Sequence, residues 1–182
     1  MDPAIQTILQ RFTEVGDQKY GREAVTQLEH ALQTATLAME ENAAPALIVA
    51  ALLHDSGHVL EVGQLPTYNK RNLDDGHEQR GYAWVLKHFG PRVADPVRLH
   101  VSAKRYLCTT DPQYQQVLSR TSFKSYLDQG GSMSDAELLN FEAEPHFKAA
   151  LRLRRWDDLA KDPERETPSI DAFVPQLEAS LI

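Results

Sequence analysis

Residues 45–58 read PALIVAALLHDSGH, an apolar run that ends in a histidine–aspartate pair. Proline is favoured at the first position of a helix, so Pro45 is expected to begin one. The stretch is apolar nearly all round, which is typical of a helix that is buried on every side. Gly57 is expected to stop it. The sequence therefore predicts a buried central helix that carries His54 and Asp55 at its end.

Helical patterns continue on both sides of this segment. Upstream, apolar residues recur at three- and four-residue steps over about residues 23–41, a stretch that includes His30. Downstream, a polar loop over about 59–76 precedes further predicted helices over about 77–88, 91–108 and 145–161, a shorter one from 111, one opened by a capping box at 134–137, and a short helix in the tail. No alternating strand pattern appears. We therefore expect an all-α helical bundle, a single domain over 1–182 with its core at 20–161 and a C-terminal tail at 162–182.

Length and composition fit an ordinary globular domain: 182 residues, 42% hydrophobic and 25% charged. The net charge of -7, without a basic stripe, argues against a nucleic-acid partner. The single cysteine, Cys108, cannot form an internal disulfide, which favours a reducing compartment. No signal-peptide pattern opens the chain, and its longest apolar run, APALIVAALL, is too short to cross a bilayer. We expect a cytoplasmic protein without a membrane partner; the sequence does not indicate its oligomeric state.

Histidines and aspartates recur along the predicted helices in the order H…HD…H…H…D. The six residues are His30, His54, Asp55, His77, His100 and Asp157. Imidazole and carboxylate groups suit first-row metals such as iron, and one carboxylate can bridge two ions. A lone histidine near an apolar face is more often a packed core residue. The ordered set nevertheless favours a dinuclear metal site inside a helical bundle, whereas His88 and His146 are interpreted as surface residues and Cys108 and Trp156 as core.

The same residues resemble the HD-domain superfamily, whose signature is HDSGH at 54–58 with His30 upstream and Asp157 downstream. Within that superfamily the chain resembles the PhnZ-type diiron oxygenases, which cleave the carbon–phosphorus bond of 2-amino-1-hydroxyethylphosphonate. The stretches that carry this closer resemblance are YGREAVTQLEHALQ at 20–33, AALLHDSGH at 50–58, HVSAKRYL at 100–107, LDQGGSM at 127–133 and LRLRRWDDLAK at 151–161.

The resemblance implies two iron ions bridged by Asp55, with dioxygen as co-substrate. One ion would be held by His30, His54 and Asp157, and the other by His77 and His100. It also implies a set of residues that bind the phosphonate: His58, Lys104, Ser122, Gln129 and Arg154. Lys104 lies one helical turn beyond His100, and Arg154 lies three residues before Asp157, so each shares a face with a ligand.

Tyr20 and Glu23 form a further implied set. By resemblance, Tyr20 occupies an iron position at rest and leaves it when substrate enters, while Glu23 faces the amino end of the substrate. Together with His58 and Lys104 they are the expected catalytic residues. Gly21-Arg22 departs from the relatives, in which an apolar residue followed by glycine is expected, so the position of a glycine hinge is in doubt.

Three functions are compatible with the sequence. The first is a mixed-valent diiron oxygenase acting on a 1-hydroxy-2-(trimethylammonio)ethylphosphonate to give glycine betaine and phosphate, or on the primary amine to give glycine. Tyr20, Tyr68 and Tyr82 favour the trimethylated substrate, because aromatic faces bind quaternary ammonium groups. The second is an HD-type phosphohydrolase that uses a metal-bound hydroxide. The third, a non-catalytic helical module, is disfavoured because all six ligand positions are filled.

Overall fold

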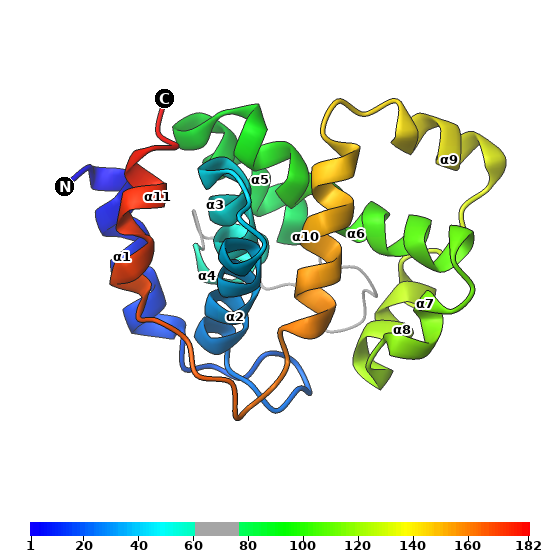
Figure 1. Ribbon diagram of the computed structural model, residues 1–182, viewed down its shortest axis with the longest axis horizontal. Coiled ribbons are helices and arrows are strands. Elements are labelled where there is room, and N and C mark those ends of the chain that lie inside the picture. Colours follow the sequence, from blue (N-terminus) through cyan, green and yellow to red (C-terminus); the bar gives the residue numbers. More distant parts are fainter. Residues whose placement is uncertain (61–76) are drawn as a thin grey trace, which may run out of the picture.

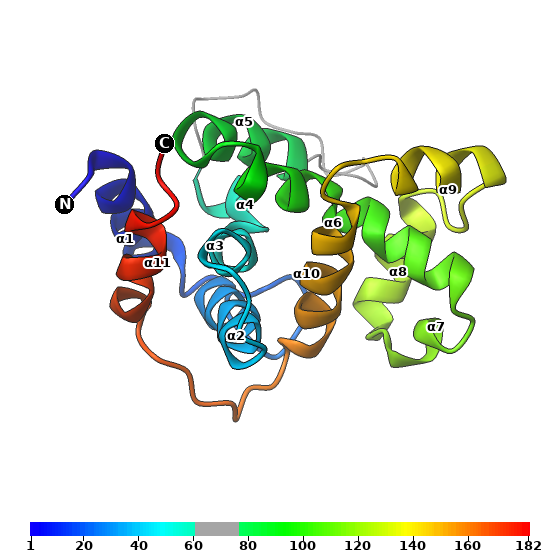
Figure 2. The ribbon, with the colours of Figure 1, turned by 45° about the horizontal axis from the view of Figure 1, so that its top comes forward.

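Helix α3 (Pro45–Leu53) lies at the centre of the molecule, and every residue from Leu47 to Leu53 is buried. The computed structural model describes residues 1–60 and 77–182, although side chains are not described at residue 58 or at residues 77–80. Around α3 pack helices α2 (Gln27–Glu40), α6 (Pro91–Thr110) and α10 (Phe147–Leu159). Figure 2 looks nearly along α3, with α2 on one side of it and α5 (His77–Phe89) on the other. The predicted buried central helix is confirmed, and so is its start at Pro45.

The residues that were expected to form the first helical turn of α2 instead form a loop-like turn that precedes the helix. Thr26 forms a capping box with Glu29, so the helix begins at Gln27, and the predicted start near residue 23 is wrong. Residues 20–26 form a tight turn in which the backbone N–H of Tyr20 donates to the carbonyl of Val25 at 3.0 Å. Gly21 has a φ of 56°, a conformation that glycine adopts at little cost.

Gly57 does not end the central segment as expected. After Leu53 the chain turns through His54 and Asp55 and enters a short helix, α4 (Ser56–Val59). A side chain added at Gly81 of helix α5 (His77–Phe89) would meet the backbone nitrogen of Gly57 at 2.8 Å. The two helices therefore pack backbone against backbone. The predicted polar loop begins later than expected, because Val59 and Leu60 are buried, and its remainder at 61–76 lies outside the described residues.

The remaining helices surround this core. The capping box at Ser134 and Glu137 is confirmed. Helix α1 was not predicted; it buries Ile5, Ile8 and Phe12 and lies beside the tail helix at one edge of the molecule (Figure 1). The elements not yet given bounds are α1 (Pro3–Val15), α7 (Tyr114–Val117), α8 (Arg120–Asp128), α9 (Asp135–Glu142), the 3-10 helix η1 (Ile170–Phe173) and α11 (Val174–Glu178).

The described part of the chain is all-α, as predicted, and forms one domain. Across residues 1–60 and 77–182, the only β pairing is an isolated bridge between Lys19 and Thr26. Cys108 and Trp156 are core residues, as interpreted from the sequence. No helix within these ranges is long and apolar enough to cross a membrane.

Candidate metal centre

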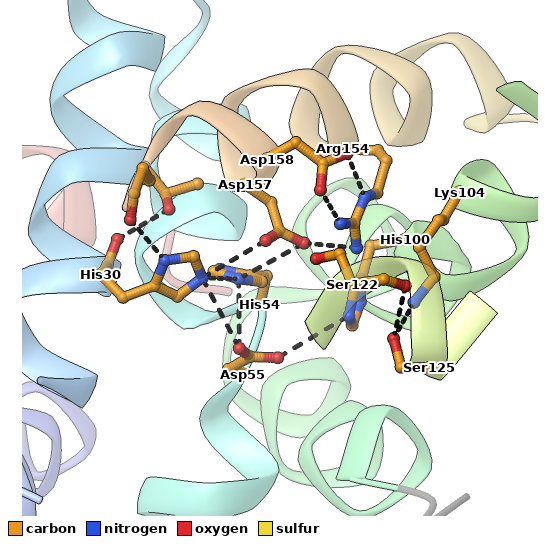
Figure 3. A network of polar contacts seen from close by, with 12 residues as sticks. His30, His54, Asp55, His100, Lys104, Ser122, Ser125, Arg154, Asp157 and Asp158 are labelled. Carbon is orange, nitrogen blue, oxygen red and sulfur yellow. Dashed lines mark hydrogen bonds and ion pairs between the residues drawn. The ribbon is translucent and has the colours of Figure 1, made fainter. Parts of the chain in front are cut away.

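Four helices bring five of the six predicted ligands together in the interior. His30 lies in the first turn of α2, His54 and Asp55 follow α3, His100 lies in the middle of α6, and Asp157 lies near the end of α10. All five are buried and face one another (Figure 3). The sixth, His77, is the first residue of α5, but its side chain lies outside the described residues.

Each of the three histidines described in this cluster has its Nδ1 against a backbone carbonyl. The pairs are His30 with Ala160 at 2.7 Å, His54 with Ala51 at 2.9 Å and His100 with Val97 at 2.6 Å. A carbonyl oxygen can only accept, so Nδ1 carries the hydrogen and the neutral ring keeps a lone pair on Nε2. Metal-binding histidines are commonly oriented in this way.

The lone pairs converge on one point. Nε2 of His30 lies 3.1 Å from Nε2 of His54. Each neutral ring has its one hydrogen on Nδ1, where it is donated to a carbonyl, so neither Nε2 carries a hydrogen that could join the two rings. Oδ1 of Asp157 lies 3.4 Å from Nε2 of His30, and no described residue donates a hydrogen bond to it. Two facing lone pairs and a buried carboxylate oxygen are unfavourable without a cation. The donor set therefore fits a divalent metal.

Asp55 faces both sides of this cluster. Its Oδ2 lies 3.4 Å from Nε2 of His54 and 3.8 Å from Nε2 of His30, whereas its Oδ1 lies 3.7 Å from Nε2 of His100. Potential ligand atoms of His30, His54 and Asp55 lie within 4.8 Å of one another. The two oxygens of one carboxylate thus face different imidazoles, an arrangement that suits a bridge between two ions.

The charge states suit ligation. Burial by itself raises the pKa of the Asp157 carboxyl, but the Arg154 guanidinium holds that pKa well below its ordinary value. Nη1 of Arg154 lies 2.7 Å from Oδ2 of Asp157. Asp157 is therefore an anion at neutral pH, as a metal-binding carboxylate must be.

Tyr20 lies against the histidine cluster. Its ring stacks on that of His30, with 3.8 Å between centroids and 16° between planes. Burial, together with the Asp55 and Asp157 carboxylates, raises the pKa of its phenol well above the ordinary value. The turn at residues 20–26 thus places Tyr20 beside His30, and its ligation of iron stays a prediction.

Cationic side chains lie next to the carboxylates. Figure 3 shows Arg154, Lys104 and Ser122 together on the opposite side of Asp157 from His30. Besides Asp157, Arg154 binds the carboxylate of Asp158 through Nε at 2.9 Å and through Nη2. Nζ of Lys104 donates to the hydroxyl of Ser125 at 2.6 Å. Burial and the charge of Arg154 lower the pKa of Lys104 to about 7.

Lys161 and Asp158 belong to this group and were not predicted from the sequence. Nζ of Lys161 donates to the hydroxyl of Ser122 at 2.7 Å and lies 3.6 Å from Oδ1 of Asp158. Lys161 lies four residues after Asp157 and seven after Arg154. Continued helical spacing from α10 would put Lys161 on the face of Arg154 and Asp157, and this was the available signal.

The other predicted substrate residues are placed less closely. Glu23 accepts a hydrogen bond from the hydroxyl of Ser119 at 2.5 Å and lies 4.0 Å from Nζ of Lys161. Gln129 caps the far end of α8 from Ser122, and its buried Oε1 accepts no hydrogen bond from the described residues. His58 lies in α4, but its side chain is outside the described residues. The two histidines interpreted as surface residues lie away from the cluster: His88 packs on Trp84, and His146 pairs with Asp95 at 2.8 Å.

Comparisons with known proteins agree with this architecture. Residues 28–129 match the family model described as HD domain. The chain is 43% identical over 168 residues to hydroxymethylphosphonate dioxygenase of Gimesia maris, covering 90% of this chain and 82% of that protein. It is 39% identical over 168 residues to the glycine-betaine-forming [1-hydroxy-2-(trimethylamino)ethyl]phosphonate dioxygenase of Leisingera caerulea, covering 92% and 85%. An uncharacterized protein of Acanthamoeba polyphaga mimivirus is 34% identical over 171 residues, covering 93% and 78%.

The family match and the similarity to the two dioxygenases both cover most of the helices that carry the cluster. The HD-domain match runs from α2, which holds His30, to the end of α8, which holds Ser122. The two dioxygenases are also similar over about nine-tenths of this chain. The chain therefore belongs to the HD-domain family of metal-dependent enzymes, in the branch of the PhnZ-type oxygenases.

Proposed function

We propose that this protein is a diiron oxygenase that cleaves the carbon–phosphorus bond of a 1-hydroxyalkylphosphonate. The observation that carries the proposal is the contact between two groups of side chains. Asp157, a predicted ligand, is bound directly by Arg154, which belongs to the cationic group that also includes Lys104 and Lys161. A metal centre beside these cationic side chains suits a substrate that presents an oxygen to the metals and an anion to the cations.

In this proposal His30, His54 and Asp157 hold one iron, His77 and His100 hold the other, and Asp55 bridges them. Bound iron would supply the site at which dioxygen is reduced. The reaction balances without an added reductant: the carbon–phosphorus bond breaks, both oxygen atoms enter the products, and a carboxylic acid and inorganic phosphate are released. Hydroxymethylphosphonate and dioxygen, for example, give formate and phosphate.

The side chains beside the metals bind and orient the phosphonate. The guanidinium of Arg154 offers a planar set of donors, whereas the ammonium of Lys104 acts as a point charge. Ser122, Gln129 and His58 are proposed to add hydrogen bonds. Because these groups are fixed in the fold, they hold the C1 carbon beside the metals and stabilise the charge of the departing phosphate.

The substituent on C1 distinguishes three candidate substrates. From the sequence, the trimethylammonio compound is favoured because Tyr20, Tyr68 and Tyr82 could form an aromatic cage around its quaternary ammonium group. Tyr68 lies outside the described residues, the Tyr20 ring stacks on His30, and the guanidinium of Arg98 lies 5.6 Å from the centre of the Tyr82 ring. The proposal therefore specifies the shared 1-hydroxyphosphonate end. The trimethylammonio, primary-amine and unsubstituted hydroxymethyl compounds are to be compared directly.

Phosphate release with and without dioxygen tests the proposal. Iron-loaded protein is expected to release phosphate from at least one of the three compounds in air, with one dioxygen consumed per phosphate, and to release none under anoxic conditions. Equal release in the absence of dioxygen would show a hydrolase of the kind that shares this metal framework. The ranking of kcat/KM among the three compounds identifies the preferred substituent.

A further inference from the structure

Lys161 connects three parts of the molecule at the edge of the candidate site. It lies just beyond the end of α10, and its side chain is only 11% exposed. Nζ donates to the hydroxyl of Ser122 at 2.7 Å and lies 4.0 Å from Oε1 of Glu23. Glu23 in turn accepts from Ser119, whose hydroxyl caps the start of α8 by accepting from the backbone N–H of Ser122. A buried ammonium in this place orients its neighbours as well as supplying charge.

The hydrogen bond from Lys161 determines what the Ser122 hydroxyl can still do. A serine hydroxyl has one hydrogen to donate and two lone pairs. Since Lys161 has no lone pair when charged, Ser122 must be the acceptor in this pair, and its own hydrogen stays available. No residue that the structure describes accepts that hydrogen, although Ser122 is buried.

The neighbouring lysine–serine pair shows the contrast. Lys104 donates to the hydroxyl of Ser125 at 2.6 Å, in the same way that Lys161 donates to Ser122. The Ser125 hydroxyl, however, passes its hydrogen to the backbone carbonyl of Ser122 at 3.0 Å. Of these two pairs on α8, the Lys161–Ser122 pair thus keeps a hydrogen for a ligand, and it keeps it beside Lys104 and Arg154 (Figure 3).

We propose that Lys161 is a positioning residue of the phosphonate site, which fixes the Ser122 hydroxyl as a hydrogen-bond donor toward the anionic head group. This inference rests on the proposed function. Lys161 acts through Ser122 rather than by touching the substrate, and its pairing with Glu23 keeps the ammonium in place. A hydrogen bond to a charged group that is oriented in advance contributes to affinity because little order is lost on binding.

A double-mutant cycle tests this role. The ligand is methylphosphonate, which lacks the C1 hydroxyl, and calorimetry measures its binding to the iron-loaded protein under anoxic conditions. Lys161→Met and Ser122→Ala are each expected to weaken binding about 10-fold, the effect of one charge-assisted hydrogen bond. If Lys161 acts through Ser122, the double variant binds about as well as either single variant. Effects that multiply, to about 100-fold, would overturn the positioning role.

Two further variants separate hydrogen bonding and charge from a loss of folding. Lys161→Arg and Lys161→Gln both keep an N–H donor and are expected to retain most of the affinity that Lys161→Met loses. Lys148→Met, at an exposed position on α10, is the matched control and should bind as wild type does. If Lys161→Met melts early, Lys161→Ala, which also removes the donor, takes its place in the cycle. An unchanged affinity in a folded Lys161→Met protein would also refute the role.

The outcomes of the double-mutant cycle distinguish failure of the Lys161 role from failure of the proposed function. If the wild-type protein binds methylphosphonate but the two substitutions act independently, only the role of Lys161 fails. If the wild-type protein does not bind methylphosphonate, the phosphonate site fails and the role of Lys161 fails with it. Steady-state assays add a check: Lys161→Met is expected to raise KM for the preferred substrate about 10-fold and to change kcat much less, because the pairing serves the head group.

Discussion

Replacing Asp55 with asparagine removes one charge and almost no volume, so it isolates the role of the carboxylate between the histidines. Oδ2 of Asp55 lies 3.4 Å from Nε2 of His54, and Oδ1 lies 3.7 Å from Nε2 of His100. A neutral amide is a much weaker ligand, and its NH2 group offers hydrogens to one of these two sides. If Asp55 bridges two ions, Asp55→Asn must weaken the binding of both.

The magnitude follows from linkage between metal binding and folding. An ion that binds only the native state at 100 to 1,000 times its Kd adds about 2.7 to 4.1 kcal/mol to the free energy of unfolding. For a chain of this length each kcal/mol raises Tm by about 2–4 °C. Each ferrous ion is therefore expected to raise the Tm of the wild-type protein by about 5–16 °C, so two ions raise it by about 10–32 °C. In Asp55→Asn the rise should fall below about a third of that value.

The assay is anoxic scanning calorimetry with and without ferrous iron, combined with elemental analysis of the desalted protein. Asp95→Asn is the matched control, because Asp95 also pairs with a histidine, His146, away from the cluster. This control should keep the wild-type iron content and the wild-type rise in Tm. Two irons per chain in Asp55→Asn, with an undiminished rise, would refute the bridging role.

Three further predictions concern the pocket and its support. Burial and Arg154 lower the pKa of Lys104 to about 7, so its ammonium is lost as pH rises through that value. Methylphosphonate affinity, measured by calorimetric titration across this pH range, should therefore fall above about pH 7. The fall should be absent in Lys104→Arg. Tyr20→Phe keeps the stacking on His30 but removes the phenol that substrate must displace, so phosphonate should bind about 3- to 10-fold more tightly; weaker binding would contradict the gating role. Leu153→Ala opens a cavity at a fully buried position of α10 and should lower the free energy of unfolding by about 2–5 kcal/mol in urea titrations. A loss below about 1 kcal/mol would contradict this packing.

The helices that carry the cluster could be predicted because each one has a strong periodic pattern or a clear start signal. Pro45 and the apolar run after it define α3, and the spacing of apolar residues defines α2 and α10. Once these helices pack, His30, His54 and Asp157 can meet only inside the bundle. The histidine–aspartate cluster could therefore be predicted from pattern and resemblance together.

Other features depend on contacts that periodicity does not report. The turn at residues 20–26 follows from the reciprocal bonds of Thr26 and Glu29, which stop the helix short of Glu23. The short helix α4 depends on the close backbone approach of Gly81, which lies far along the chain.

The charged end of α10 was also ambiguous from sequence. Residues 154–161 read RRWDDLAK, in which charges occur all round the helix. Only packing shows that Arg154, Asp158 and Lys161 turn inward, whereas Arg155 lies on the exposed side with its guanidinium 5.5 Å from the ring centre of Tyr114. Arg154, Asp158 and Lys161 are spaced at i, i+4 and i+7, and Asp157 lies at i+3. This spacing is compatible with a shared inward orientation but does not require it.

The most direct measurement of the central claim is Mössbauer spectroscopy on catalytically active protein enriched in iron-57, with the iron content of the same sample measured by elemental analysis. We expect two irons per chain whose spectra show magnetic coupling through a shared ligand, and the coupling should disappear in Asp55→Asn. Full activity in protein that holds one isolated iron, or one metal that cannot change its oxidation state, would contradict this claim.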